Sequence, residues 1–399
     1  MKVKRLLVLL LIVLKDAGPT TAQTCSSSCS ATECSCWDMG LTSVPQDLPT
    51  TITRLDLRSN AITTLSQSDL SRYRNLQFLR ITYNPLSIVN DGTFDNLISL
   101  TELRLGNRLS SIPSNMPITL TTLLLLGNGN GITSLGHSDL SRYRSLEILS
   151  FMSQQIFTIE SGTFHHLTNL TSLSLFNNRL SSIPAEIFEP LGKLEVLSLA
   201  YNNLASLPAD IFQGLGNLKR LFLGQNRLSS LPADIFEGLV NLDDLSLGGN
   251  LITSLPAGIF ERLGNLVSLT LEGNPWQCDC NMRPFKQTLT EYHDFAYDIE
   301  CAGPANLAGQ RFLDVDSEDL ICEIPASTTK HAASCSSVSD RIFWKNCIAI
   351  KFWKKANCRK MCKKCLKQCS KCSKKFRKVC PDQGTRQNTC LQEFRETCS

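Results

Sequence analysis

Residues 170–193 read LTSLSLFNNRLSSIPAEIFEPLGK, and the same 24-residue pattern returns three times. The later copies are LEVLSLAYNNLASLPADIFQGLGN (194–217), LKRLFLGQNRLSSLPADIFEGLVN (218–241) and LDDLSLGGNLITSLPAGIFERLGN (242–265), followed by the start of a fifth, LVSLTLEGNP (266–275). An asparagine holds the same place in each copy: Asn178, Asn202, Asn226, Asn250 and Asn274. A period in this range is the signature of a stacked repeat architecture.

The L-x-L core of each copy predicts a short strand. Because successive side chains of a strand point to opposite faces, Leu173 and Leu175 should face inward and Phe176 outward. One such strand cannot bury its apolar face alone, so the copies must stack as rungs of a solenoid with one parallel sheet. The asparagine carries both an acceptor and a two-proton donor, so it can satisfy backbone groups where the chain turns.

The return half of each rung also repeats. Prolines recur at Pro184, Pro208, Pro232 and Pro256, and phenylalanines at Phe188, Phe212, Phe236 and Phe260. We expect the phenylalanines to stack as a core spine beneath the convex side.

Five earlier strands extend the series: Leu55-x-Leu57, Leu79-x-Ile81, Leu103-x-Leu105, Leu123-x-Leu125 and Leu149-x-Phe151. They bring the predicted total to about ten rungs. At strand spacings of roughly 4.8 Å, the inner sheet would be about 45 Å along its arc, which is room for a protein domain or a long glycan.

The first half of the chain contains a second, longer repetition. Residues 41–60 return in altered form as 109–128, and the heptapeptide SDLSRYR at 68–74 returns unchanged at 138–144. The offset changes from 68 to 70 residues, which indicates an insertion at or near Gly129-Asn130. We interpret this as duplication of a block of rungs, and Gln154, which replaces the turn asparagine, predicts a locally weakened or rebuilt turn.

Residues 1–22 read as a secretory signal, since Lys2, Lys4 and Arg5 precede a short apolar run and small residues follow. The predicted product is secreted and extracellular, without a transmembrane segment. Residues 23–54 should form a cysteine-rich N-terminal cap, 55–274 the repeats, 275–322 a C-terminal cap, 323–334 a linker and 335–399 a tail. In an oxidising compartment, the 18 cysteines should form disulfides.

The cysteines flanking the repeats resemble the caps of extracellular leucine-rich-repeat proteins. Cys25, Cys29, Cys34 and Cys36 precede the first rung, and their pairing stays open. After the last rung comes PWQCDC at 275–280. This motif is similar to the family's C-terminal cap, and the resemblance implies the disulfides Cys278–Cys301 and Cys280–Cys322.

Signal, caps and LPxxxF rungs together most resemble the variable lymphocyte receptors and their relatives. The resemblance implies recognition by the concave face, in an innate or immune-type role. The wider family also includes matrix proteoglycans, guidance cues and growth-factor binders, so a matrix or growth-factor regulator is the alternative.

The tail differs from the rest in charge. Residues 335–399 hold 17 Lys and Arg against 4 Asp and Glu, a net charge of +13, whereas residues 23–334 carry −12. Five cysteines spaced 4, 3, 4 and 3 residues apart predict one amphipathic helix over 358–372. The candidate polyanion-binding residues on its other faces and just beyond are Arg359, Lys360, Lys363, Lys364, Lys367, Lys371, Lys374 and Lys375.

Several roles for the tail stay open. It could bind sulphated glycosaminoglycan or an anionic microbial surface, or it could carry an antimicrobial or channel-blocking activity. Its ten cysteines allow a compact monomer or a disulfide-linked oligomer. Zinc is a weaker alternative, because the two C-x-x-C pairs lie only three residues apart.

Nothing in the sequence indicates an enzyme. None of the five histidines has a metal-ligand or triad spacing, and no phosphate-binding loop is present, so we expect no cofactor, metal site or nucleic-acid partner. His165-His166 reads as a solvated pair on the convex return. Asn169-Leu170-Thr171 is an N-glycosylation sequon bordering a strand.

The outward residues of the strands are the candidate binding site for a protein or glycan. They begin charged, become apolar in the middle, and fade in the last two rungs to Ser246, Gly248, Ser268 and Glu272. Apolar side chains exposed on a rigid sheet usually mark an interface. The selected residues are Arg58, Arg80, Tyr83, Leu124, Leu126, Met152, Phe176, Tyr201, Phe222 and Gln225.

Overall fold

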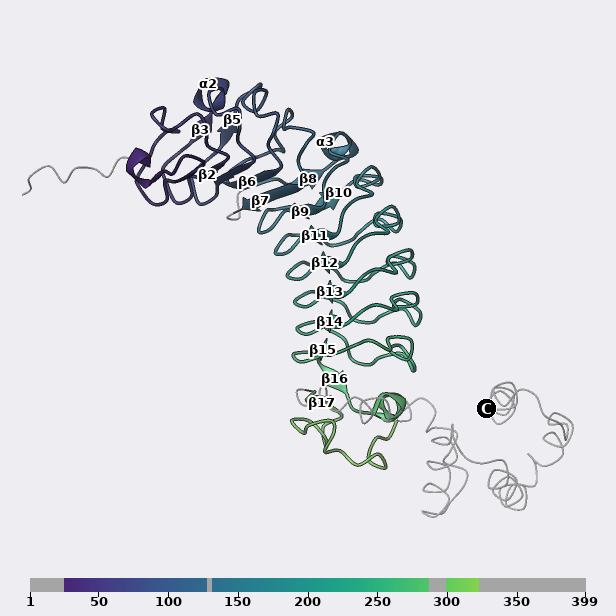
Figure 1. Ribbon diagram of the computed structural model, residues 1–399. Coiled ribbons are helices and arrows are strands. Elements are labelled where there is room, and N and C mark those ends of the chain that lie inside the picture. The colour runs from purple at the N-terminus through teal and green to yellow at the C-terminus, as the bar shows by residue number, and fades with distance from the viewer. Residues whose placement is uncertain (1–24, 128–130, 287–298, 323–399) are drawn as a thin grey trace, which may run out of the picture. The chain divides into compact units, whose positions relative to one another are not determined.

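The computed structural model describes residues 25–127, 131–286 and 299–322 (Figure 1). The chain divides into two units, Met1–Ser317 and Glu318–Ser399, and only residues 318–322 of the second are described. The predicted signal peptide, linker and tail therefore lie outside the described residues. No helix in the described part of the chain combines the length and apolar character needed to cross a membrane.

The first unit is a solenoid built on one parallel sheet of eleven strands. In spatial order the strands are β1 (Glu33–Ser35), β2 (Arg54–Asp56), β4 (Phe78–Ile81), β6 (Glu102–Asn107), β7 (Thr122–Gly127), β9 (Ile148–Ser150), β11 (Ser172–Ser174), β12 (Val196–Ser198), β13 (Arg220–Phe222), β14 (Asp244–Ser246) and β15 (Ser268–Thr270). The predicted total of about ten is one short, because β1 belongs to the N-terminal cap and places Cys34 where the other strands place leucine.

The inward leucines are in exact register along the sheet. Leu55, Leu79 and Leu103 are partners across the first strands, and the same register continues to Leu269. Almost all of these side chains are fully buried. Burial of a leucine contributes about 1.5–3 kcal/mol, so the repeated column supplies a large share of the folding free energy.

The turn asparagines connect neighbouring rungs by a repeated pair of hydrogen bonds. Asn202 accepts from the Leu180 amide at 3.1 Å, and its Nδ2 donates to the Leu175 carbonyl at 2.9 Å. The residue before each asparagine adopts positive φ in most rungs, as at Tyr201 (57°), Gln225 (57°) and Gly249 (66°). The predicted role of the asparagine is confirmed: it satisfies the groups that this left-handed turn removes from the sheet.

The phenylalanine spine beneath the convex side is also present. The rings of Phe212 and Phe236 are stacked with centroids 6.5 Å apart, and Phe236 and Phe260 lie 6.1 Å apart. The series is longer than predicted, since Phe285 and Phe312 of the C-terminal cap continue it. The spine therefore joins the repeats and the cap in one core.

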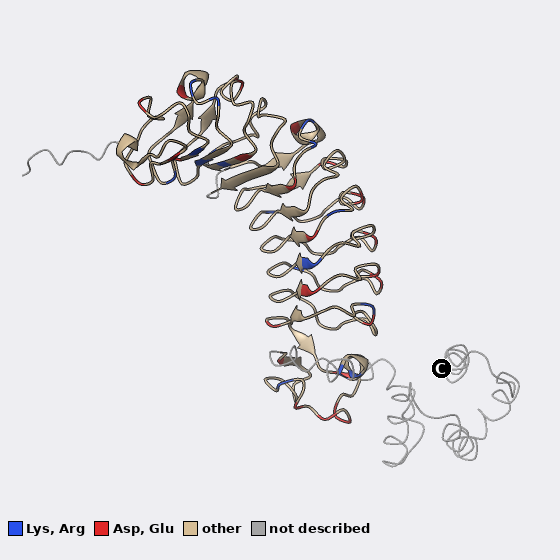
Figure 2. Ribbon diagram, viewed as in Figure 1, with Lys and Arg blue, Asp and Glu red and all other residues tan. Residues whose placement is uncertain are grey.

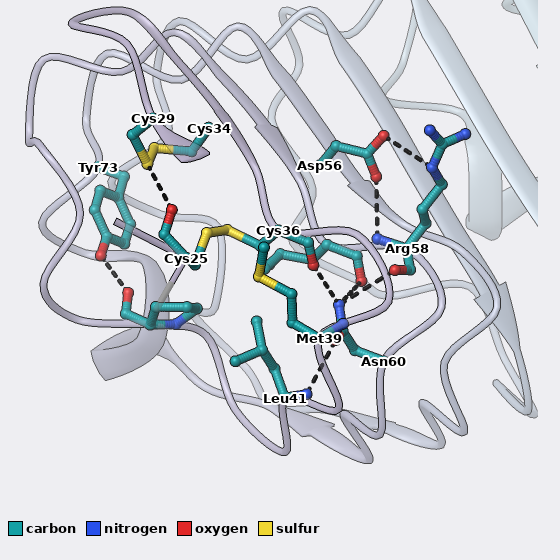
Figure 3. The surroundings of a disulfide bond; sticks show 12 residues. Cys25, Cys29, Cys34, Cys36, Met39, Leu41, Asp56, Arg58, Asn60 and Tyr73 are labelled. Carbon is teal, nitrogen blue, oxygen red and sulfur yellow. Dashed lines mark hydrogen bonds and ion pairs between the residues drawn. A yellow bond between two sulfur atoms is a disulfide. The ribbon is translucent and has the colours of Figure 1, made fainter. Parts of the chain in front are cut away.

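Both caps are closed by disulfides. In the N-terminal cap, which includes η1 (Cys25–Ser28), the bonds are Cys25–Cys36 and Cys29–Cys34 (Figure 3). The predicted bond Cys278–Cys301 is confirmed. It joins the ends of β16 (Trp276–Gln277) and β17 (Cys301–Gly303), with η2 (Cys280–Met282) following. Cys280 is also in a disulfide, and so is Cys322.

The sequence duplication is preserved in three dimensions. The helices α2 (Gln67–Leu70) and α3 (His137–Leu140) each follow a short strand. Each has an aspartate as its third residue, Asp69 or Asp139, which accepts the backbone amide of the residue before the helix. These strands pair in two small parallel sheets, β3 (Thr64–Leu65) with β5 (Ile88–Val89) and β8 (Ser134–Leu135) with β10 (Thr158–Ile159). Tyr73 and Tyr143 are both buried and donate to the Pro45 and Ser114 carbonyls of the preceding rung.

The junction between the two copies is the irregular part of the sheet. Successive inward leucines elsewhere lie 24 residues apart, but Leu103 and Leu123 are separated by 20 and Leu123 and Leu149 by 26. Here β6 and β7 continue to pair over six residues instead of turning away. Gly127 is required at this place, because a Cβ there would lie 2.2 Å from the Ser153 carbonyl oxygen.

Candidate ligand-binding face

The concave face consists of the outward side chains of the eleven-stranded sheet and of the turns that follow the strands. Each rung contributes two residues that flank the inward leucine, one residue just after the strand, and the residue with positive φ before the asparagine. Because register is constant, equivalent residues form columns along the solenoid. The character of the face therefore changes from rung to rung with the sequence.

The first rungs form a charged region (Figure 2). Arg58 and Arg80 both lie near the Asp56 carboxylate, at 3.3 and 3.9 Å. Phe78 faces this surface but is only 7% exposed, because the guanidinium groups of Arg54 and Arg104 cover its ring at 4.0 and 5.4 Å from the centroid. These cations already have partners, which lowers their availability to a ligand.

One aromatic residue of this region was not among the face residues predicted from the sequence. Trp37 follows β1, occupies the place that Arg58 holds in the next rung, and is 53% exposed. The Arg58 guanidinium carbon lies 5.5 Å from its ring centroid. Recognition of Cys34-x-Cys36 as a variant of L-x-L would have identified Trp37 as a face residue.

The middle rungs are apolar, and β7, β9, β11 and β12 carry few charges in Figure 2. Leu124 and Leu126 are half-buried on β7, and Met152 is 38% exposed after β9. The next residue of the same column is Phe176, also half-buried. Four predicted residues therefore form a continuous apolar patch, which we call the central patch (Leu124, Leu126, Met152 and Phe176).

Beyond the central patch the face is hollowed into a groove of about 390 Å³. Its lining is Phe176, Ser198, Ala200, Tyr201, Phe222, Gly224, Gln225, Ser246, Gly248 and Glu272. The Phe176 and Tyr201 rings lie against each other, with centroids 5.0 Å apart, and form one wall. Gly224 and Gly248 leave the floor without side chains.

The predicted site residues thus fall into separate places. Phe176, Tyr201, Phe222 and Gln225 come together in the groove, which adjoins the central patch. Arg58, Arg80 and Tyr83 lie on the charged first rungs, several strands away. The groove is also lined by three residues of the last two rungs that were not among the selected residues: Ser246, Gly248 and Glu272. Small residues open a hollow where bulky neighbours flank them.

Tyr83, Tyr201 and Gln225 owe their exposure to the backbone. Each occupies the left-handed conformation that precedes a turn asparagine, with φ of 57–58°. Tyr83 is 61% and Tyr201 50% exposed. A non-glycine residue in this conformation costs about 1 kcal/mol or more, a cost that the turn hydrogen bonds offset.

The glycosylation candidate Asn169 belongs to a set of bonds on the returning side. Its Nδ2 donates to the Arg144 carbonyl at 3.1 Å, and Lys193 donates to its Oδ1 at 2.8 Å. The equivalent bonds are made by Asn217, Asn241 and Asn265. This second asparagine ladder was not predicted. Asn169 is half-exposed.

The histidines of the convex side form a cluster rather than an isolated pair. The His166 ring lies 5.3 Å from the ring of His165 and 5.3 Å from that of His137, which belongs to α3 of the preceding rung. Partial loss of hydration, the positive charge of Arg144 and the two neighbouring imidazoles lower the pKa of His166 below its usual 6.5. No group of three or more metal-binding side chains is arranged around a metal position among the described residues.

The solenoid with disulfide-closed ends and an exposed concave face is a leucine-rich-repeat fold. The leucine-rich-repeat model matches residues 50–112, 168–228 and 216–275, and the model of the leucine-rich-repeat C-terminal domain matches residues 298–323. The gap in the matches includes the junction of the duplicated copies.

Individual relatives are similar over part of their length. Asporin of Bos taurus is 31% identical over 100 residues, covering 25% of this chain and 27% of asporin. Biglycan of Sus scrofa is 32% identical over 138 residues, covering 33% and 48%, and human Toll-like receptor 8 is 33% identical over 158 residues, covering 34% and 15%. The chain therefore spans less than half of each of these relatives.

A solved structure is similar over a longer part of the chain. It is titled as the octameric complex of Latrophilin 3, Unc5D and FLRT2 (LRR), and one of its chains matches with a TM-score of 0.53 and 28% identity. The match covers 71% of this chain and 80% of that one. That chain is therefore similar to this one in both fold and sequence.

Proposed function

We propose that this protein is a secreted recognition protein that binds a protein or glycan ligand on its concave face. The observation that carries the proposal is the central patch with its adjoining groove: four large apolar side chains on neighbouring rungs, continuous with a hollow that has an aromatic wall. Apolar groups held at solvent on a rigid sheet stabilise a complex when a partner covers them. Similarity to a chain of the FLRT2 complex supports this use of the fold.

An innate or immune-type role is the finer form of the proposal. The partial identity with human Toll-like receptor 8 supports it. The signal sequence and a glycan on Asn169 belong to the same proposal: the sequon lies on the returning side, so a glycan would leave the groove open.

The alternative is a regulator of the extracellular matrix or of growth factors. Identity with the matrix proteoglycans asporin and biglycan favours it. In this case the basic tail would hold the protein on sulphated glycosaminoglycan while the face binds its partner. The two roles share the binding face and differ in the ligand.

The test begins with the full secreted chain, screened against microbial surfaces and host extracellular proteins. Bound candidates are then tested with a variant in which Leu126, Met152 and Phe176 are replaced by aspartate. Three charges on the patch should reduce binding at least a hundredfold, because each would be desolvated at the interface. The control replaces three exposed convex residues, Ile98, Ile118 and Val240, by aspartate.

Circular dichroism and urea unfolding report folding of both variants. A variant of the central patch that stays folded and binds as the natural chain does would refute the proposal. Loss of binding in the convex control would also contradict it, since the interface would then lie on the other side.

A further inference from the structure

The groove contains one charged side chain, the carboxylate of Glu272. This exposed side chain lies toward the neighbouring rung, since a Cβ on Gly248 would be 2.6 Å from its Oε1. A Cβ on Gly224 would lie 2.9 Å from the Ser246 hydroxyl oxygen. Gly248 is therefore what allows the carboxylate to lie over the groove floor, and Gly224 leaves the next part of the floor without a side chain.

This carboxylate differs from two other acids of the concave face. Asp56 and Glu102 each pair with an arginine of the face. Among the residues that the structure describes, no side chain forms an ion pair or hydrogen bond with the Glu272 carboxylate, and no lysine or arginine lines the groove. The groove consequently offers one negative charge without a partner.

The remainder of the lining is suited to the stem of a basic side chain. Phe222 lies two strands from Glu272 along the floor, and Tyr201 stands beside it against Phe176. Aromatic faces attract guanidinium and ammonium groups, and glycine backbone permits close approach of an extended chain. An anionic ligand would be repelled here, and a neutral sugar would leave the carboxylate without a counter-charge.

We propose that the groove binds an arginine or lysine side chain of a protein partner. The cationic head pairs with Glu272, the methylene stem crosses Gly248 and Gly224, and an adjoining residue of the partner contacts Phe222 and Tyr201. The inference rests on the proposed function, in which the concave face is the binding surface, and it narrows the ligand to a polypeptide with a basic residue.

The experiment uses the full chain on an array of immobilised decapeptides. The peptides are made in sets of four that share the same apolar flanks and differ only in the central residue, which is arginine, lysine, citrulline or glutamate. Several sets with different apolar flanks are printed, with neutral chitotetraose beside them. Citrulline has the shape of arginine without its charge. The variants are Glu272→Gln, Glu272→Lys and, as a matched control on the convex return, Glu261→Gln.

The natural chain and Glu261→Gln should bind arginine peptides about tenfold more strongly than citrulline peptides, as expected for an ion pair assisted by aromatic contact. Glu272→Gln should abolish this preference, and Glu272→Lys should reverse it in favour of glutamate. Near-ultraviolet circular dichroism verifies that the variants keep the fold.

Three results would overturn the inference. The first is an arginine preference that is absent, or unchanged in Glu272→Gln. If peptides still bind in that case and Phe176→Asp abolishes their binding, the concave face is the binding surface as proposed, but Glu272 does not select a basic residue. The second is binding of chitotetraose that depends on Glu272 without any arginine preference. The third is a preference seen only in the tail variant (Lys363, Lys364, Lys367 and Lys371 all replaced by glutamine), since the chain's own tail would then be the occupant.

Discussion

Gln154 donates from its Nε2 to the Leu125 carbonyl at 3.0 Å and accepts from the Ile132 amide at 3.0 Å, so it replaces the turn asparagine at the junction of the duplicated copies. In the regular rungs the acceptor carbonyl lies 27 residues before the asparagine, as for Asn178 and Phe151. For Gln154 it lies 29 residues before, because the insertion adds two. The turn is rebuilt with a longer side chain and retains both inter-rung bonds.

Replacement of Gln154 by asparagine should destabilise the solenoid although it restores the family pattern. The shorter side chain cannot reach both partners, so a buried carbonyl or amide is left without a hydrogen bond, at a cost of about 1–3 kcal/mol. Urea unfolding with hydrogen exchange of the amides around Ile132 measures the effect. Gln213→Asn, on an exposed return, is the control and should change little. Equal stability of Gln154→Asn and the natural chain would contradict the account.

The histidine cluster predicts a dependence of stability on pH. The folded state holds the pKa of His166 below 6.5, so between that value and the lower folded pKa the unfolded state binds more protons. The contribution of His166 to the free energy of unfolding therefore becomes more unfavourable to the folded state as pH falls through 6.5. Below the folded pKa this contribution stays constant. Proton NMR titration of the imidazole should give a pKa below 6.5.

Arg144→Gln should raise that pKa, because the guanidinium charge is one of its causes. Arg179→Gln, which removes an exposed charge not among those causes, is the control. A His166 pKa at or above 6.5 in the natural chain would show that the cluster has no such effect.

Binding of the tail to polyanions should depend on its lysines. Cations clustered within a Debye length of roughly 8 Å act together on a polyanion, and the affinity falls steeply as salt rises. On a heparin column the tail variant should elute at clearly lower salt than the natural chain. Its control carries four substitutions by glutamine on exposed solenoid positions: Arg108, Lys193, Arg227 and Arg262. Identical elution of the tail variant and the natural chain would refute the prediction.

The cysteine spacing in the tail predicts a monomer. Cysteines on one helical stripe are poor partners for each other, because a disulfide needs a specific relation of the two Cβ vectors. The five stripe cysteines can instead pair with the five others: Cys335, Cys347, Cys380, Cys390 and Cys398. Non-reducing electrophoresis of the secreted chain should show one band of monomer size. A series of bands of higher mass that disappears on reduction would show a disulfide-linked oligomer instead. Its several concave faces would then bind a multivalent ligand with avidity.

The repeats could be predicted in detail from the sequence because their contacts are local to neighbouring rungs. A constant spacing of 24 residues places each leucine, asparagine and phenylalanine beside its equivalent, so Leu173 and Phe236 could be assigned to the core directly. The C-terminal disulfide Cys278–Cys301 followed from the family motif. The order of charged and apolar rungs on the concave face could also be predicted from the alternation of inward and outward residues in each strand.

Tertiary structure alone decided the features that depend on side chains of different rungs. Alternation marks Gly224, Gly248 and Glu272 as outward but does not show that the glutamate lies across the glycine floor, since that depends on the rotamer and on empty space. Cys34 lies in the sheet, and Trp37 on its concave face, because β1 pairs with β2. The amino-acid order determined a solenoid with a concave sheet. Three-dimensional packing determined where that sheet is hollowed into a groove and that Glu272 supplies the charge in its lining.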